Sequence, residues 1–206
     1  MKTVVVDYGM GNLRSVAKAL QSSGFEEVKV SAYSEEISSA DVLIFPGQGA
    51  FKKAMENIKR RHLVKPLLYH IERGKPFLGI CLGLQLLFER SYEHGLTEGL
   101  KVFEGEVCLL PVQLKLPHIG WNQIWIRKKS DIFKEINNGE FFYFVHSYHV
   151  IPRNEDIIAS VTDYGVNFVS AICKENVWAV QFHPEKSQKK GLQLLKNFKD
   201  FCKRIL

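Results

Sequence analysis

The sequence of 206 residues contains few cysteines and no long apolar run. Its four cysteines lie far apart, whereas small secreted proteins that depend on disulfides carry a much denser pattern, so we expect reduced thiols. A membrane-spanning helix needs about 18 uninterrupted apolar residues, and no segment reaches that length. The amino-terminal apolar run ends at Asp7, which is too early for a secretory signal peptide. These absences favour a cytoplasmic protein that does not enter a membrane.

Patterns that bind metals or nucleotides are also missing. The sequence has no Cys-x2-Cys and no His-Glu-x-x-His spacing, which are the common signatures of zinc sites. No Gly-Lys-Ser or Gly-Lys-Thr follows the glycine-rich turn at residues 46–49, and the loop at residues 9–14 has Arg14 where a dinucleotide fingerprint has its third glycine. We therefore predict neither a metal nor a bound cofactor.

The charge is moderately positive. A total of 28 Lys and Arg against 22 Asp and Glu gives a net charge of +6. The basic clusters at residues 59–61, 127–129 and 186–204 are interleaved with acidic residues or apolar helix positions. Such clusters are typical of solvated faces, with an acidic or phosphorylated partner as the alternative. We expect no nucleic-acid partner.

The first half of the chain alternates short β-rich runs with helical patterns, which is typical of a parallel sheet covered by helices. Apolar residues repeat at helical spacing from Leu13 to Leu20, and Gly24 is expected to end that helix. A second helical stretch covers residues 51–73, with an interruption before Pro66. The expected strands cover residues 2–6, 28–32, 41–45 and 75–80.

The second half of the chain has a different pattern. Between residues 101 and 182 nearly every segment is β-like, with turn signals between the segments, and we expect these strands to extend the same core. Residues 189–206 carry apolar side chains at helical spacing, which indicates a closing amphipathic helix. No repeat, linker or low-complexity segment interrupts the chain, so the simplest organisation is a single domain over residues 1–206.

Residues 79–83, Gly-Ile-Cys-Leu-Gly, have the pattern of a nucleophile elbow with cysteine in place of serine. A buried strand ends at Cys81, and the apolar residues up to Phe88 indicate that a helix follows. The strained turn of an elbow presents the thiol at the carboxyl end of the sheet, and the glycines let neighbouring backbone pass close. The alternative is a cysteine that simply packs between strand and helix. We interpret the other three cysteines as structural: Cys108, Cys173 and Cys202.

A cysteine nucleophile needs a base, and only one of the seven histidines ends an apolar strand and is followed by a carboxylate that could orient it. An apolar strand ends at His183, and Glu185 follows after Pro184. If the backbone stays extended, His183 and Glu185 point the same way, and the carboxylate can fix the tautomer that accepts the thiol proton. A surface turn could contain the same three residues. By contrast, His146 and His149 fall on opposite faces of an expected strand and are interpreted as packing or hydrogen-bonding residues.

The glycine-rich turn at residues 46–49 is the third candidate element. It follows a predicted strand, and its glycines can turn backbone N–H groups toward an oxygen that gains negative charge during a reaction. The N–H of Leu82 could join them to form an oxyanion hole. A phosphate cradle is the alternative use of such a turn, and the absence of a following lysine makes it the weaker one.

Six motifs together make the sequence resemble a known family. They are residues 7–13, 46–51, 79–83 with Gln85, 117–122 (Pro-His-Ile-Gly-Trp-Asn), 143–148 (Tyr-Phe-Val-His-Ser-Tyr) and 181–185 (Gln-Phe-His-Pro-Glu). The chain resembles the class I (triad) glutamine amidotransferases and, among them, the glutaminase subunits of imidazole glycerol phosphate synthase, an enzyme of histidine biosynthesis. The resemblance covers residues 3–187, nearly the whole chain.

This resemblance implies an α/β, flavodoxin-like three-layer fold in which helices flank a central, mainly parallel sheet. It also implies hydrolysis of L-glutamine to L-glutamate and ammonia without a cofactor. Cys81 would attack the side-chain amide, His183 would pass the thiol proton to the departing ammonia, and Glu185 would orient His183. Water would then cleave the glutamyl thioester. The remaining implied roles are framing the oxyanion, by Gly47, Gln48 and Leu82, and binding the amino-acid end of glutamine, by Gln85, Glu93 and the backbone of Ser147 and Tyr148.

For three of these positions, Gln85, Glu93 and Gln48, the sequence also allows another interpretation or departs from the family pattern. Taken alone, Gln85 would be an amide on a helix surface and Glu93 a solvated loop acid. Gln48 departs from the family pattern, in which an aliphatic residue is common at this position. Because the backbone supplies the N–H there, we expect the chemistry to be retained and only the dynamics of the loop to differ.

The resemblance also implies a partner. The family works as a heterodimer with a (β/α)8-barrel cyclase, and Asn12, Trp121 and Lys186 correspond to positions that face the barrel. Taken alone, these residues would be a helix cap, a core side chain and a solvated surface residue, respectively. Family glutaminases are nearly inactive alone, and we expect the same here, with the peptide at residues 46–49 turned the wrong way until the partner and its ligand bind.

Two other functions remain open at this point. Close relatives of these subunits supply ammonia to amidotransferases that build amino sugars for surface polysaccharides, and the three candidate catalytic residues are common to both groups. A non-catalytic binding subunit could also have kept the fold, although the joint presence of Cys81, His183 and Glu185 argues against it. A stand-alone peptidase is less well supported, because no separate substrate cleft is evident in the sequence.

Overall fold

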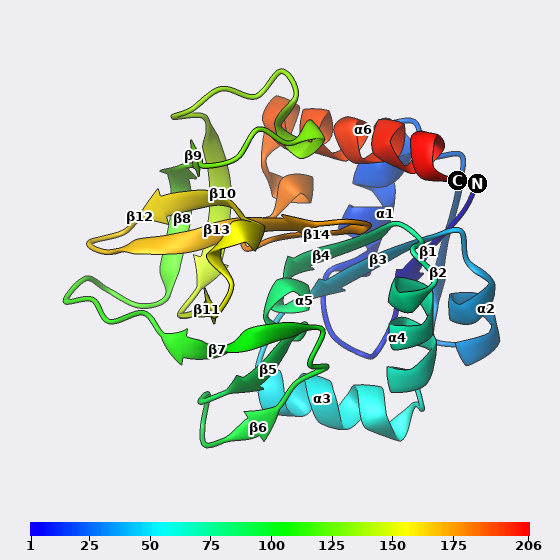
Figure 1. The fold of residues 1–206 in the computed structure, drawn as a ribbon, viewed down its shortest axis with the longest axis horizontal. Coiled ribbons are helices and arrows are strands. Elements are labelled where there is room, and N and C mark those ends of the chain that lie inside the picture. Colours follow the sequence, from blue (N-terminus) through cyan, green and yellow to red (C-terminus); the bar gives the residue numbers. More distant parts are fainter.

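The computed structural model describes all residues, 1–206, and has a large mixed sheet at its centre (Figure 1). The eight strands are, in sheet order, β2 (Glu27–Ser31), β1 (Lys2–Val6), β3 (Val42–Gly47), β4 (Phe77–Cys81), β14 (Val177–Val180), β13 (Asn167–Lys174), β12 (Ile158–Asp163) and β9 (Trp125–Ile126). The first five are parallel, and the last three are antiparallel to their neighbours.

Helices cover both faces of this sheet. One face carries α1 (Leu13–Ser22) and α6 (Gln188–Ile205), and the other carries α2 (Ser34–Ser39), α3 (Phe51–Arg60) and α4 (Val64–Glu72), as Figure 1 shows. Each face has its own core of 28 buried apolar residues. Because apolar side chains alternate between the two faces of each parallel strand, both layers of helices can bury an apolar stripe against the sheet. The predicted three-layer α/β fold is confirmed.

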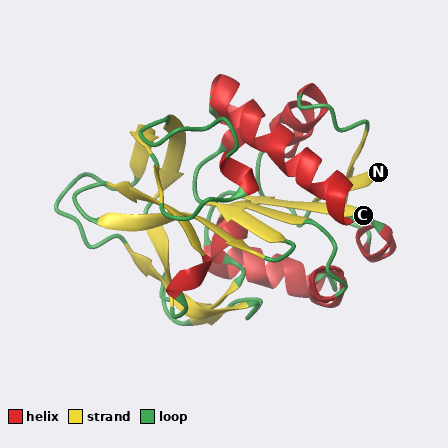
Figure 2. Cartoon of the chain, turned by 45° about the horizontal axis from the view of Figure 1, so that its top comes forward, coloured by secondary structure: helices red, strands yellow, loops and turns green.

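Two smaller sheets stand at the end of the molecule away from the chain termini (Figure 2). One has four strands, and the other pairs two antiparallel strands. Their strands are β11 (Tyr148–Pro152), β7 (Phe103–Leu109), β5 (Phe88–Ser91) and β6 (Thr97–Glu98) in the first, and β10 (Phe141–His146) with β8 (His118–Gln123) in the second. Of the later strands only β9, β12, β13 and β14 join the central sheet, but the smaller sheets bury side chains such as Val107 and Phe144 in the same two cores, as expected.

The predicted elements of the first half are confirmed, with one correction. The four predicted strands correspond to β1, β2, β3 and β4, and the helical stretch at residues 51–73 divides into α3 and α4, with Pro66 in the first turn of α4. However, α5 (Leu82–Gln85) is a single turn, and Phe88 begins a strand. The backbone carbonyls of residues 86–88 accept hydrogen bonds from the N–H groups of residues 100–103, so they are not available to continue a helix.

The parallel strands bring their carboxyl ends to one edge of the sheet. Gly47 at the end of β3 lies in register with Cys81 at the end of β4, and Val180 at the end of β14 lies in register with Ile80. The chain segments that follow these three strands therefore begin side by side. Ligand sites in open α/β sheets form at this edge. No helix of the structure combines the length and the apolar character that crossing a bilayer requires.

Candidate active site

Cys81 occupies the sharp corner between β4 and α5, as the elbow pattern predicts. Its backbone has φ 55° and ψ −108°, in the left-handed half of conformational space, which is strained for a residue with a side chain. The glycines around it are required by close packing. A Cβ on Gly83 would lie 1.8 Å from the carbonyl oxygen of Phe45, and one on Gly79 would lie 3.0 Å from Cβ of Ala179. Cys81 as a whole is 5% exposed, so it is buried but still reached by solvent.

His183 and Glu185 follow β14 at the same edge of the sheet. Nδ1 of His183 lies 2.8 Å from Oε1 of Glu185, and both side chains are 2% exposed. The contact differs from the prediction in one respect. The backbone does not stay extended through Glu185, because a 3-10 turn, η3 (Pro184–Lys186), brings the carboxylate back toward the ring. Pro184 favours this turn, since its fixed φ suits the first position of a helix.

The imidazole of His183 lies between a carboxylate and a thiol. Burial lowers the pKa of His183, but the negative charge on the Cys81 sulfur, its hydrogen bond and the contact with Glu185 together outweigh burial and raise the pKa to about 10. Nδ1 is occupied by Glu185, and Nε2 is buried with no polar partner other than the nearby Cys81. Nε2 is therefore the nitrogen left to exchange a proton with Cys81.

The backbone of His183 is fixed by three hydrogen bonds. Its N–H donates to the carbonyl oxygen of Tyr143 at 2.9 Å, and its carbonyl oxygen accepts from the Ser187 hydroxyl at 2.6 Å and from the Lys186 N–H at 3.0 Å. A base held in this way needs little reorganisation before it reacts. The structure thus brings together the three residues predicted as nucleophile, base and orienting carboxylate.

A cavity of about 560 Å³ opens beside the thiol. Eight of the predicted site residues line it or contribute backbone to it: Gln48, Cys81, Leu82, Gln85, Glu93, Ser147, Tyr148 and Lys186. Its size suits a small molecule such as an amino acid. Four wall residues were not identified from the sequence: Ala50, Pro117, Val145 and His146. His183 and Glu185 are not among its lining residues and lie behind Cys81.

Two residues predicted to bind the substrate, Gln85 and Glu93, form hydrogen bonds with other groups of the protein. Nε2 of Gln85 donates to the carbonyl oxygen of Tyr148 at 2.9 Å and to Oε1 of Gln181 at 3.1 Å. Oε2 of Glu93 accepts from the N–H of Phe51 at 2.6 Å, at the start of α3. Gln85 is buried, so the alternative of an amide on a helix surface is wrong. Glu93 is half-buried and is not a freely solvated loop acid.

The glycine-rich turn lies against the elbow. Gly47 is in register with Cys81, and Gln48 and Leu82 both line the cavity. A side chain at position 47 is impossible without rearrangement, because a Cβ would lie 2.0 Å from the hydroxyl of Tyr8 and 2.9 Å from Cβ of Leu82. That hydroxyl is fully buried and has no hydrogen-bond partner. Burial, and then the charge of Cys81, raise the pKa of Tyr8, so the hydroxyl remains protonated.

Of the three residues predicted to face a partner, two contact the same aromatic ring. Asn12 caps α1, since its Oδ1 accepts from the N–H of Ser15 at 3.3 Å. Trp121 is 45% exposed, so the alternative of a core side chain is wrong. Its ring lies 6.0 Å from the ring of Tyr143, and Nζ of Lys186 lies 5.7 Å from the same ring. Trp121 and Lys186 therefore meet at Tyr143, and the helix that Asn12 caps packs against η3, which carries Lys186.

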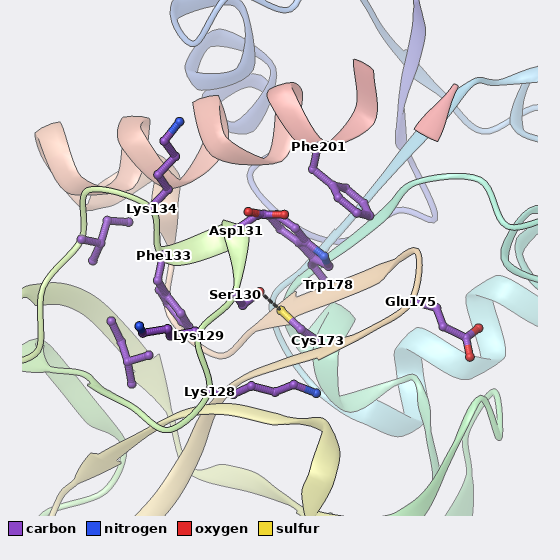
Figure 3. A pocket seen from close by; sticks show the side chains of 12 residues that line it. Lys128, Lys129, Ser130, Asp131, Phe133, Lys134, Cys173, Glu175, Trp178 and Phe201 are labelled. Atoms are coloured by element: carbon purple, nitrogen blue, oxygen red, sulfur yellow. Dashed lines mark hydrogen bonds between the residues drawn. The ribbon is translucent and has the colours of Figure 1, made fainter. Parts of the chain in front are cut away.

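A second cavity, of about 680 Å³, lies under α6 (Figure 3). Its wall contains Cys173, whose sulfur accepts a hydrogen bond from Ser130 Oγ at 3.4 Å. Burial raises the pKa of Cys173 to about 12, and burial likewise raises the pKa values of Cys108 and Cys202. Thiols of this kind are poor nucleophiles at neutral pH. The structural interpretation of these three cysteines fits their surroundings, and no histidine lines this cavity.

Comparisons with known proteins agree with this geometry. The family model described as "Glutamine amidotransferase class-I" matches residues 4–201. The chain belongs to the class-I glutamine amidotransferases. Within this family it is 61% identical over 205 residues to "Imidazole glycerol phosphate synthase subunit HisH" of Aquifex aeolicus, covering 100% of this chain and 99% of that protein. The proteins of the same name from Caldanaerobacter subterraneus and Pyrococcus furiosus are 49% and 48% identical, with at least 96% of each chain covered.

Solved structures of class-I amidotransferases share the fold. A structure titled "Crystal structure of glutamine amidotransferase" has a TM-score of 0.75 at 19% identity and covers 97% of this chain and 98% of its own. The glutaminase domain of Trypanosoma brucei CTPS with bound acivicin has a TM-score of 0.70 at 16% identity, covering 99% and 94%. At such low identities the likeness concerns the fold alone. The predicted family, fold class and enzyme class are confirmed, and this class-I amidotransferase is closely similar to the HisH subunits.

Proposed function

We propose that this class-I amidotransferase hydrolyses L-glutamine to L-glutamate and ammonia with Cys81, His183 and Glu185, as the glutaminase subunit of imidazole glycerol phosphate synthase. The observation that carries the proposal is the alignment of a carboxylate, an imidazole and a thiol from two neighbouring strand ends, beside a cavity of about 560 Å³. High identity over the whole chain to proteins named as subunits of that synthase supports the choice of this reaction over ammonia supply for amino sugars.

The reaction follows from the order of the three groups. The Cys81 sulfur attacks the carboxamide carbon of glutamine, and the thiol proton moves to Nε2 of His183. As the tetrahedral intermediate collapses, His183 gives that proton to the nitrogen, the C–N bond breaks and ammonia leaves. The resulting glutamyl thioester is attacked by water, with His183 as the base, and glutamate is released. Glu185 keeps Nδ1 protonated throughout, so Nε2 performs both transfers.

The backbone at Gly47, Gln48 and Leu82 is suited to stabilise the tetrahedral oxyanion. A single N–H donor directed at such an oxygen is typically worth about 2.7–4 kcal/mol of activation free energy. The side chain of Gln48 is not required for this, because the donor belongs to the backbone. We propose that the Gln48 peptide rotates to present its N–H when a partner binds against this edge, and we therefore expect low activity of the chain alone.

The polar groups of the cavity wall can hold the amino-acid end of the substrate. Gln85 offers its side-chain carbonyl, since its amide nitrogen is already engaged, and Glu93 keeps one carboxylate oxygen free of the contact to Phe51. Both are acceptors and suit the substrate ammonium group. The backbone of Ser147 and Tyr148 forms the adjacent wall and completes the recognition site.

The partner in this proposal is a (β/α)8-barrel cyclase that forms a heterodimer with this chain and receives ammonia from it. The exposed ring of Trp121 and the ammonium group of Lys186, which meet at Tyr143 near the mouth of the cavity, support a docking face there, and Asn12 would add a polar contact from α1. The single-domain organisation over residues 1–206 and a cytoplasmic location belong to the same proposal.

A variant of the assembled synthase tests the function. Cys81→Ala should abolish synthesis with glutamine as nitrogen donor and leave synthesis with added ammonium salts near the wild-type rate. Cys108→Ala serves as the matched control, because Cys108 lies on β7 outside the cavity, and it should retain both activities. Loss of both activities in a correctly assembled Cys81→Ala complex would contradict a glutaminase role and indicate a structural one.

A further inference from the structure

Gln181 contacts the candidate nucleophile directly, and no step of the reaction described above uses it. Its Nε2 lies 3.6 Å from the Cys81 sulfur, within hydrogen-bond distance for a sulfur acceptor. Its Oε1 accepts the hydrogen bond from Gln85 at 3.1 Å. The side chain is fully buried, so water does not compete for either end. One amide therefore connects the thiol to a residue of the substrate-binding wall.

The surrounding contacts fix which end of the amide faces the sulfur. The carbonyl oxygen of Tyr148 can only accept, so the Gln85 end that points to it at 2.9 Å must be the NH2 group. The same NH2 group also donates to Gln181, which must therefore present its oxygen there. The NH2 group of Gln181 is left facing Cys81, and it has no carbonyl or carboxylate acceptor nearby.

The backbone explains why Gln181 and His183 reach the same atom. Gln181 follows Val180, which lies in register with Ile80 of β4, so it stands directly beside Cys81, and the chain bends at Gln181 and Phe182 before it reaches His183. Phe182 between them packs into the core beneath α1 and α6, where its ring lies 4.2 Å from that of Phe142. The N–H of Gln181 donates to the carbonyl oxygen of Ser170 at 2.9 Å, which holds the segment against β13.

We propose that Gln181 is a positioning residue for this reaction, which donates a hydrogen bond to the Cys81 thiolate and orients Gln85 so that its carbonyl faces the substrate. An N–H donor stabilises a charged sulfur more than a neutral one, so Gln181 favours the reactive thiolate. Its oxygen prevents the Gln85 amide from flipping, and the acceptor for glutamine thereby stays in place. The inference rests on the proposed function, because it assigns Gln181 to the same nucleophile and the same substrate.

The isosteric variant Gln181→Met removes both contacts and leaves the volume nearly unchanged. In the assembled synthase without glutamine, the rate of alkylation of Cys81 by iodoacetamide is followed against pH by mass spectrometry of the Cys81 peptide. We expect the midpoint of this profile to move to higher pH by about one unit, which corresponds to a roughly tenfold loss of thiolate at a given pH. We also expect kcat to fall by about tenfold and the KM for glutamine to rise.

A second variant separates the two contacts. Gln181→Glu keeps an oxygen for Gln85 but places a carboxyl group beside the sulfur, so the alkylation profile should move at least as far as in Gln181→Met, while the KM for glutamine stays close to wild type. Apart from the carboxyl group that Gln181→Glu introduces, the charged and titratable groups around the thiol are unchanged in both variants, so a shift of the alkylation profile reports on position 181. These groups are Tyr8, Glu93, His146, His183, Glu185 and Lys186.

The control is Gln193→Met on α6, which loses a hydrogen bond to Asn197 of 2.9 Å far from the cavity. It should retain the wild-type alkylation profile and KM. Thermal denaturation of each complex checks that a change in the profile does not reflect unfolding. A wild-type alkylation profile in both Gln181 variants, or equal KM values in Gln181→Met and wild type, would overturn the proposal. Such a result would leave the proposed function intact, because that depends on the separate Cys81→Ala experiment.

Discussion

His183 and Glu185 form a buried pair in which Nδ1 lies 2.8 Å from Oε1 and neither side chain is more than 2% exposed. A carboxylate buried at this depth is costly unless a cation or a strong donor compensates it. Here the compensating group is the imidazolium of His183, whose pKa is raised to about 10 despite burial, by Cys81 and by Glu185. The pair therefore stores the proton that the leaving ammonia requires.

Glu185→Gln should reduce glutamine turnover while leaving the fold intact. Glutamine has nearly the same shape, but its neutral amide no longer raises the pKa of His183 and can present an N–H to Nδ1, which would select the wrong tautomer. We expect kcat to fall by about 10²–10⁴-fold, with ammonia-dependent synthesis unchanged. Steady-state kinetics of the assembled synthase measures this. A kcat within about twofold of wild type would show that Glu185 does not orient the base.

Tyr8 and Gly47 should behave as a coupled pair in stability measurements. Tyr8→Phe removes a buried hydroxyl without a partner and should raise the free energy of unfolding by about 1 kcal/mol. Gly47→Ala should lower it by roughly 1–3 kcal/mol, because the new Cβ would lie 2.0 Å from that hydroxyl. The double variant should be more stable than the sum of the single effects, as urea denaturation would measure. Strict additivity would mean that the hydroxyl does not limit the space at position 47.

Trp121→Ala should weaken binding of the cyclase partner. An exposed tryptophan supported by Tyr143 and beside a lysine has the features of an interface hot spot, and truncation there typically costs about 2 kcal/mol or more, which is roughly a 30-fold increase in Kd. The matched control is Tyr69→Ala, since Tyr69 is 51% exposed on α4, away from Trp121. Titration calorimetry with the partner gives both values. Equal Kd values for the two variants would place the docking face elsewhere.

His70 should make stability depend on pH below neutrality. Burial lowers its pKa to about 4, despite the hydrogen bond from Nε2 to the carbonyl oxygen of Pro76. Because the unfolded chain binds this proton near pH 6.5 and the folded chain does not, the contribution is fully present above pH 6.5 and is lost as the pH falls toward 4, by at most about 3 kcal/mol. His118 and His146 have lowered pKa values for the same reason and act in the same direction.

His70→Gln isolates this contribution. The glutamine amide can donate to Pro76 in place of the ring and does not titrate. The free energy of unfolding, measured by urea denaturation between pH 4 and 7, should fall less steeply with decreasing pH in the variant than in wild type. Parallel curves would show that His70 does not remain neutral in the folded chain.

Much of the fold follows from local patterns in the sequence. Alternating β and helical periodicity predicted β1 to β4 and the helices α1, α3, α4 and α6, because those elements bury apolar stripes, whereas α2, in which only Ile37 is buried, was not predicted. The segment after Gln85 did not follow its local pattern. The apolar residues 86–88 fit a helix, but their backbone carbonyls accept hydrogen bonds from the N–H groups of residues 100–103. Local periodicity cannot reveal this long-range pairing. The division of the later strands into three sheets depends on the same kind of pairing.

The residues of the candidate site that belong to short sequence motifs could be predicted. A glycine-bracketed cysteine and a histidine followed by a carboxylate identified Cys81, His183 and Glu185, which the structure brings together. Gln181 lies inside one of these motifs, yet its contact with the sulfur requires two strands to be adjacent and was not found. The buried environment of Tyr8 was missed for the same reason, since only the packing of β1 beside β3 places its hydroxyl at Gly47.

The most direct test of the account is covalent labelling of the assembled synthase with an electrophilic diazoketone analogue of glutamine, followed by mass spectrometry of every cysteine peptide. We predict one adduct per chain, on Cys81, which glutamine competes away and which Glu185→Gln forms much more slowly. The other three cysteines should remain unmodified under the same conditions. An adduct on Cys108, Cys173 or Cys202 in place of Cys81, or labelling that excess glutamine does not slow, would contradict the assignment of Cys81 as the nucleophile.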